Sequence, residues 1–121
     1  MIDSHFFERE EFACKCGCGF DAVDEELLGV LEDLRLKFDK PVIINSGCRC
    51  YEHNKKEGGS QGSQHLFAKA VDIRVVGVDA DEVADHLLYA YPDTYGIGRY
   101  DGRTHIDVRE NKARWDKRDK K

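Results

Sequence analysis

Two segments of the chain alternate apolar and polar side chains with the two-residue period of a β-strand. The segment 69–76 reads KAVDIRVV, and the segment 104–109 reads THIDVR. Successive strand residues point to opposite faces of a sheet, so each segment has one apolar and one polar face. If both strands pack their apolar faces on helices, the other face of the sheet collects Asp72, Arg74, His105, Asp107 and Arg109. Such a face is either a functional site or the solvated side of an antiparallel sheet.

Two further segments have the periodicity of amphipathic helices. Residues 24–38 repeat leucine at spacings of three and four, and Asp24 stands where an N-cap residue is expected. Residues 79–91 show a similar apolar stripe and begin with Asp79 and Glu82 in the positions of a capping box.

The connecting segments predict a strand, a helical turn and a hairpin. The run VIIN at 42–45 fits a buried strand, and one helical turn is expected near residues 51–56 in an otherwise loop-like, Gly- and Ser-rich stretch. The dipeptide Asp101-Gly102 separates the segments 95–100 and 104–109 and is a strong signal for a β-hairpin.

Composition and length limit the classes of protein to consider. The 121 residues suit one hydrophobic core, and a net charge of -5 gives no electrostatic footprint for nucleic acid. No apolar run approaches the roughly 20 residues of a membrane span, and the first residues lack the pattern of a signal peptide. We therefore expect a monomer made in the cytoplasm, with one domain over residues 1–115. The basic end RENKARWDKRDKK is expected to be solvated and partly frayed, with 116–121 as a tail.

His65 adds a second imidazole to the polar face. Two imidazoles and one carboxylate form a three-ligand set suited to a catalytic zinc ion, which keeps its fourth position for water. His65 lies seven residues before Asp72, and a straight strand would separate the two by more than about 20 Å. A shared metal therefore requires the chain to fold back between them.

Several motifs carry a resemblance to a known family. SQHLFAKAVDI (63–73) resembles the Ser-x-His-x-x-Gly-x-Ala-x-Asp signature of the zinc D-alanyl-D-alanine carboxypeptidase family, and GIGRYDGRTHIDVR (96–109) resembles its second signature, which ends in His-x-Asp. INSGCRCYEHN (44–54) and GGSQGSQH (58–65) fit the branch that includes phage and prophage endolysin-type peptidases. The resemblance extends from about Phe6 to Trp115.

The resemblance implies the hedgehog/DD-peptidase fold, a small α+β domain with an antiparallel sheet, helices on one face and a zinc site on the other. The metal ligands would be His65, Asp72 and His105. Arg49 would contact the substrate and its developing negative charge, and Ser63 would shape the loop or donate a hydrogen bond to the substrate. Ala68 replaces the usual glycine of the signature, which matters only if the position needs a positive φ.

The sequence leaves more than one candidate for the general base, the group that would accept a proton from the attacking water. Related enzymes often carry an acid three residues before the last histidine ligand, and here that position is Gly102. Asp101 is the nearest carboxylate, but it also suits a hairpin turn. Asp107 shares the face of His105 and is either a base or the acceptor for the N–H of a ligating histidine.

The implied activity is zinc-dependent hydrolysis of peptide bonds in the stem peptides of peptidoglycan, by a D,D-carboxypeptidase or an endolysin-type endopeptidase acting at the bacterial cell wall. The alternative is a catalytically silent zinc-binding module of the same fold with a structural or partner-binding role. Gly102 in place of an acid keeps that alternative open.

Five cysteines have a separate pattern. Cys14, Cys16 and Cys18 cluster in CKCGCG, while Cys48 and Cys50 flank Arg49. The cysteines bind a second, structural ion, form disulfides or stay free, depending in part on the redox compartment. We expect the N-terminal segment to be tied to the SGCRC loop through these sulfurs, which would position Arg49.

Overall fold

The computed structural model describes residues 6–56 and 63–118. Residues 58–62 of the GGSQGSQH motif and the last three residues of the basic tail lie outside this description. The helices are α1 (Glu25–Phe38), α2 (Tyr51–Lys56) and α3 (Ala80–Ala90), with 3₁₀ turns η1 (Arg9–Phe12) and η2 (Gln64–Phe67). The strands are β1 (Val42–Ser46), β2 (Ala70–Val75), β3 (Gly96–Tyr100), β4 (Arg103–Asp107) and β5 (Ala113–Asp116).

The described strands form one sheet in the order β1-β2-β4-β3-β5. The pairs β1–β2, β2–β4 and β3–β4 are antiparallel, which confirms the predicted α+β fold with its antiparallel sheet. The hairpin at Asp101-Gly102 is also confirmed, because Tyr100 pairs with Arg103 across a two-residue turn in which Gly102 has φ +75°.

The fifth strand is a difference from the sequence prediction. β5 lies in the basic end for which the sequence favours a frayed segment, yet it pairs in parallel with β3 and makes the sheet mixed. Beyond it, Arg118 contacts Asp81 and Asp116. β5 is short and flanked by lysines and arginines, so no apolar alternation marks it in the sequence. It also pairs with β3 and not with β4, the strand that precedes it along the chain.

Helix caps form where the sequence predicts them. The Asp24 side chain accepts hydrogen bonds from the backbone N–H groups of Glu26 and Leu27, and α1 ends at Asp39, which has φ +52°. The Asp79 side chain accepts from the N–H of Asp81 at the start of α3. These bonds satisfy donors that the first turn of a helix leaves without a partner.

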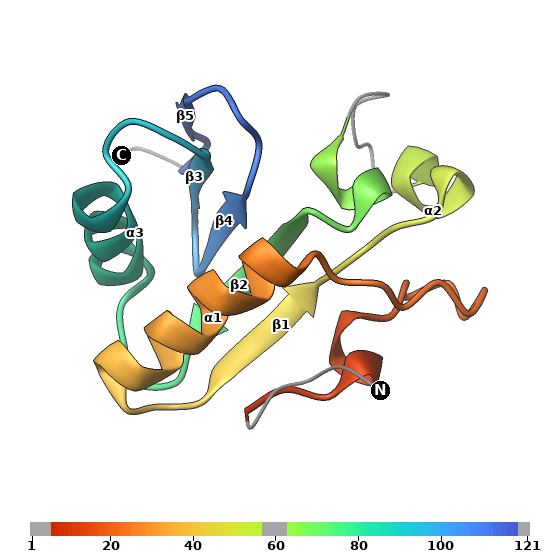
Figure 1. Ribbon diagram of the computed structural model, residues 1–121, viewed down its shortest axis with the longest axis horizontal. Coiled ribbons are helices and arrows are strands. Elements are labelled where there is room, and N and C mark those ends of the chain that lie inside the picture. The colour runs from red at the N-terminus through yellow and green to blue at the C-terminus, as the bar shows by residue number, and fades with distance from the viewer. Residues whose placement is uncertain (1–5, 57–62, 119–121) are drawn as a thin grey trace.

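One hydrophobic core joins both longer helices to the apolar face of the sheet. Leu27, Leu31 and Leu34 of α1 and Val83 and Leu87 of α3 are buried against strand residues that include Val71, Ile73, Ile97 and Ile106. Figure 1 shows α1 crossing the sheet, with α3 beside it and α2 beyond the end of β1. The side chains of Asp72, His105 and Asp107 therefore point away from the helices, whereas Thr104, on the other face of β4, donates a hydrogen bond to the Ala80 carbonyl of α3.

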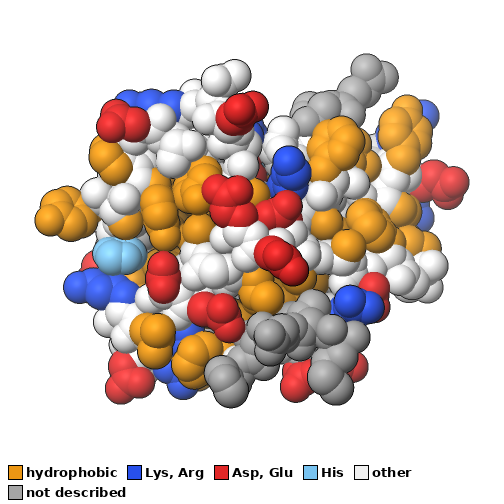
Figure 2. Space-filling model, viewed as in Figure 1, with side chains coloured by type: hydrophobic (Ala, Val, Ile, Leu, Met, Phe, Trp, Pro, Cys, Tyr) orange, Lys and Arg blue, Asp and Glu red, His pale blue; other side chains and the backbone are white. Residues whose placement is uncertain are grey.

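The surface seen from the same side carries acidic, basic and hydrophobic side chains. Figure 2 shows acidic side chains over the middle of the face that α1 covers, with lysine and arginine side chains scattered around them. Among the residues that the structure describes, no helix has both the length and the apolar character required to cross a bilayer.

Replacing Gly29 by alanine should stabilise the protein. Gly29 is exposed within α1, and a Cβ there would meet no atom within 4 Å. Alanine has the higher helix propensity and restricts the unfolded chain, so the free energy of unfolding should rise by about 0.5–1 kcal/mol in urea denaturation. Gly98→Ala is the matched contrast, because its Cβ would lie 2.3 Å from Nε1 of Trp115, and this change should destabilise. Equal effects of the two changes would contradict this assignment.

Candidate metal centre

His65 is held by hydrogen bonds to its backbone and to its ring. The Ser63 side chain accepts a hydrogen bond from the His65 N–H at 3.2 Å and caps η2, so it has the loop-shaping contact considered from the sequence. The ring atom Nδ1 lies 2.7 Å from the carbonyl oxygen of Gly47. Because a carbonyl only accepts, Nδ1 carries a proton, and Nε2 faces Asp72, whose Oδ2 is 3.5 Å away. Nε2 donates to that carboxylate when the ring is charged and offers a lone pair to a metal when the ring is neutral.

Ala68 provides the reversal that brings His65 close to Asp72. It has φ +58° at the end of η2, and its N–H bonds to the His65 carbonyl before the chain enters β2. The sequence required such a fold-back for a shared metal. The family glycine is therefore replaced at a position that does need a positive φ, at a cost of roughly 1–2 kcal/mol for a residue with a Cβ.

His105 and Asp72 face each other as a cross-strand pair of β4 and β2. His105 Nδ1 lies 3.0 Å from Asp72 Oδ1, and the two imidazole rings of His65 and His105 are 5.3 Å apart between centroids. His65, Asp72 and His105 are all buried, and their ligand atoms lie within 4.8 Å of one another. The structure thus brings together the three residues expected to bind the metal.

The electrostatics of this group are organised around the negative charge of Asp72. Burial would raise the pKa of Asp72, but hydrogen bonds with His105 and His65 outweigh it and hold that pKa well below the usual carboxyl range. Burial would likewise lower the pKa of His105, but its bonds to Asp107 and Asp72 raise it above the ordinary histidine value. A buried carboxylate that needs positive partners is the kind of group that a divalent cation stabilises.

The spacing also suits a tetrahedral ion. A zinc ion with nitrogen and oxygen ligands at about 2.0–2.1 Å requires about 3.3 Å between neighbouring ligand atoms. Asp72 Oδ1 lies 3.0 Å from His105 Nδ1, and Asp72 Oδ2 lies 3.5 Å from His65 Nε2. One ligand atom from each of the three side chains lies within 4.8 Å of the other two, so small side-chain adjustments bring them to zinc spacing. The three side chains therefore fit zinc through His65 Nε2, an Asp72 oxygen and His105 Nδ1.

Asp107 holds the outer edge of the His105 ring. Its Oδ2 lies 2.7 Å from His105 Nε2, while its two oxygens also accept bonds from Arg109 and from the Gly96 N–H. The Asp107 side chain is fully buried. Burial opposes ionisation, but the bonds from His105 and Arg109 keep the pKa of Asp107 below its usual range. This contact is the one that a zinc-ligating histidine needs from a partner on its second nitrogen.

Arg49 lies beside the same group. Its Nη2 is 3.5 Å from Asp72 Oδ2, and its Nε and Nη1 donate to Ser46 and Asn54. Its side chain is 14% exposed, so the guanidinium lies close to the surface next to the predicted ligands.

Three other residues considered from the sequence, Asp101, Arg74 and Arg109, lie outside the group of metal ligands. Asp101 is in the turn between β3 and β4 and is not among the grouped ligand atoms. Arg74 is exposed, and Arg109 is bonded to Asp107.

Trp115 is a neighbour of the candidate metal site that the sequence did not predict. Its ring centroid lies 4.9 Å from that of His105, and its Nε1 donates to the Tyr100 hydroxyl at 2.9 Å. Gly98 pairs with both His105 and Trp115 and leaves room for the indole. The signal available in the sequence was a strand with Gly96 and Gly98 in alternation, which indicates close approach by other groups.

Comparison with protein families agrees with this geometry. The family model for Peptidase M15 matches residues 5–107, a range that contains His65, Asp72 and His105. The chain therefore belongs to the Peptidase M15 family, which is of the zinc D-alanyl-D-alanine carboxypeptidase type. A search of curated proteins found no match. Membership confirms the resemblance seen in the motifs and supports metallopeptidase activity.

Replacing Asp107 by asparagine should weaken zinc binding. The amide keeps the size of the side chain but removes the charge that orients His105, so zinc affinity should fall about 10–100-fold in competition with a chromophoric chelator. Asp101→Asn is the control and should leave the affinity unchanged, because Asp101 lies outside the ligand group. An unchanged affinity in a folded Asp107→Asn protein would show that His105 does not depend on this contact.

Proposed function

We propose that the protein is a zinc peptidase that hydrolyses peptide bonds in the stem peptides of bacterial peptidoglycan. The observation that carries the proposal is the buried group His65–Asp72–His105 on the polar side of the sheet in a member of the Peptidase M15 family. The substrate class is supported by the resemblance of segments 63–73 and 96–109 to the signatures of peptidases that act on D-amino acids.

The roles of the residues follow from their contacts. His65, Asp72 and His105 would hold the ion, which when bound supplies an acidified water molecule and a Lewis acid for the scissile carbonyl. Asp107 orients His105 and is a positioning residue, because several donors already occupy both of its oxygens. Arg49 presents a guanidinium at the edge of this group, where it would bind a substrate carboxylate or the oxygen that gains negative charge.

Asp101 is proposed as the proton acceptor. It is the carboxylate next to position 102, where related enzymes often carry an acid, and it is exposed at the turn. Gly102 has φ +75°, so this turn disfavours a glutamate at position 102 itself. The sequence offered two candidates for the general base, Asp101 and Asp107. Because Asp107 orients the His105 ring, Asp101 is the candidate that is left.

The alternative function is a zinc-binding module without catalysis. Gly102 is the observation that favours it, because the turn that needs this glycine also removes the acid from its family position. Such a module would bind zinc through the same three side chains and would serve a structural or partner-binding role.

The remaining aspects of the function are proposals of the same kind. We place the activity at the bacterial cell wall, with a peptidoglycan peptide as the partner and a monomer as the working unit. Trimming of a terminal D-alanine and cleavage within the stem peptide are both compatible with an activity of this type.

Peptidoglycan digestion tests the function directly. Purified sacculi incubated with the zinc-loaded protein should release peptides whose masses identify the bond that is cut. His65→Ala should abolish release, whereas His86→Ala should retain it, because His86 lies on α3 against Phe38 and outside the ligand group. A protein that binds zinc through His65 yet releases nothing would favour the silent module.

Asp101→Asn tests the assignment of the proton acceptor. If Asp101 takes the proton, kcat should fall by about 10²–10⁴-fold while zinc affinity and thermal stability stay as in the wild type. The measurement is the steady-state rate on a released stem peptide with zinc at saturation. Wild-type turnover in Asp101→Asn would remove Asp101 from the mechanism.

A further inference from the structure

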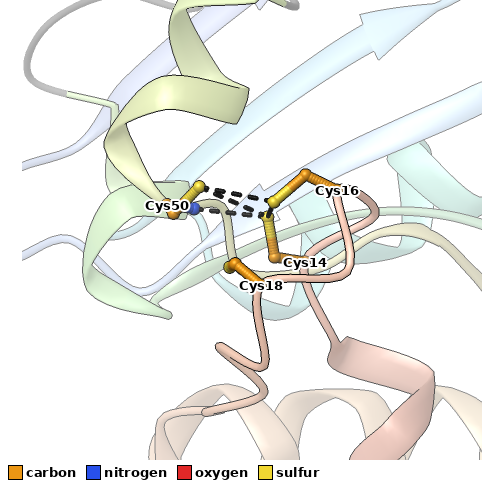
Figure 3. A group of neighbouring side chains, drawn as sticks. All are labelled: Cys14, Cys16, Cys18 and Cys50. Atoms are coloured by element: carbon orange, nitrogen blue, oxygen red, sulfur yellow. Dashed lines mark hydrogen bonds between the residues drawn. The ribbon is translucent and has the colours of Figure 1, made fainter.

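Four cysteines from two distant parts of the chain meet at one point outside the site described above. Cys14, Cys16 and Cys18 come from the segment between η1 and α1, and Cys50 directly precedes α2 (Figure 3). Their sulfur atoms all lie within 4.8 Å of one another, and none is in a disulfide.

The sulfur separations match those of a tetrahedral metal site. Zinc–thiolate bonds of about 2.3 Å place neighbouring sulfurs about 3.8 Å apart. The distances are 3.4 Å for Cys14–Cys16, 3.6 Å for Cys16–Cys50 and 3.8 Å for Cys14–Cys50. These three sulfurs therefore have the spacing of ligands to one ion, and the Cys18 sulfur lies within 4.8 Å of each of them, where it can complete the set.

The local backbone is shaped to gather these sulfurs. Cysteines two residues apart in an extended strand would be spread over more than about 6 Å per pair. Here the chain coils instead, with Gly17 at φ +81° and Gly19 at φ +96°, and a bond from the Cys14 N–H to the Phe20 carbonyl closes the loop. Glycine is suited to these two positions because it lacks a Cβ.

Packing does not account for the cluster. Cys16 and Cys18 are exposed, although unpaired cysteine is among the most buried residue types. Two backbone N–H groups, those of Cys50 and His53, donate to the sulfurs of Cys14 and Cys50 at 3.4 Å each. Bonds of this kind orient and stabilise thiolate ligands of a metal.

Cys48 behaves differently from the other four. It is buried, and its thiol donates to the carbonyl oxygens of Phe12 and Phe20, each at 3.2 Å. Cys48 is therefore a packed structural residue and provides a natural control within the same loop.

We propose that Cys14, Cys16, Cys18 and Cys50 bind one structural zinc ion as four thiolates, with release of the thiol protons on binding. The ion would join the N-terminal loop to the segment that carries Arg49. Arg49 adjoins Cys50, and its N–H donates to the carbonyl of His65, so the second ion would support the edge of the first site. The proposal concerns metal binding and does not depend on peptide hydrolysis.

Metal counting on four purified proteins tests this site. The wild type, His65→Ala/His105→Ala, Cys16→Ser/Cys18→Ser and Cys48→Ser are purified under reducing conditions, loaded with zinc, freed of excess metal and measured by mass spectrometry of the elements. We expect two zinc ions per chain in the wild type and in Cys48→Ser, and one in each double variant. Cobalt substitution should show a thiolate-to-metal charge-transfer band in every protein except Cys16→Ser/Cys18→Ser.

The His65→Ala/His105→Ala protein keeps the test decisive if the cysteine variant fails to fold. In that protein a thiol reagent should release one zinc ion as the four cluster cysteines react, whatever the peptidase activity. Absence of the charge-transfer band, iron in place of zinc, or a native disulfide among the four cysteines would overturn the proposal. Equal zinc content in Cys16→Ser/Cys18→Ser and the wild type would do the same.

Discussion

The buried carboxylate of Asp72 is the constraint around which the polar half of the molecule is arranged. It lies between two imidazoles and next to a guanidinium, on a strand whose other face is part of the hydrophobic core. A buried charge without partners is costly, so each neighbour must be supplied by a different element in the correct register. The β2–β4 pairing supplies His105, the fold-back at Ala68 supplies His65, and the loop after β1 supplies Arg49.

The N-terminal segment is connected to this arrangement through close backbone contacts. Gly47 accepts the ring proton of His65, and a Cβ at Gly47 would lie 2.5 Å from the Phe12 carbonyl oxygen. The Cys48 N–H also donates to that carbonyl at 3.1 Å. The tautomer of His65 therefore depends on a loop packed against η1, and the same loop leads to Cys50 and the sulfur cluster. The two candidate metal sites share one scaffold.

Part of this site could be predicted because it depends on local rules. Alternation along 69–76 and 104–109 placed Asp72, His105 and Asp107 on one face, and Asp24 and Asp79 marked the starts of helices at the correct residues. The motifs added His65 and Arg49 through the family resemblance. Trp115 was not predicted as a neighbour of His105, because its position depends on the pairing of β5 with β3 and on the absence of a side chain at Gly98.

By itself the sequence determined the strands β1 to β4, the helix caps, the family and the residue types that can hold zinc, because periodicity and short motifs are local properties of a chain. The tertiary structure decided which nitrogen of each histidine faces Asp72, because those orientations come from Gly47 and Asp107. It also separated Cys48 from the other four cysteines, a division that their spacing does not contain. These are contacts between segments distant in sequence, and only the folded chain brings them within hydrogen-bonding or metal-binding distance.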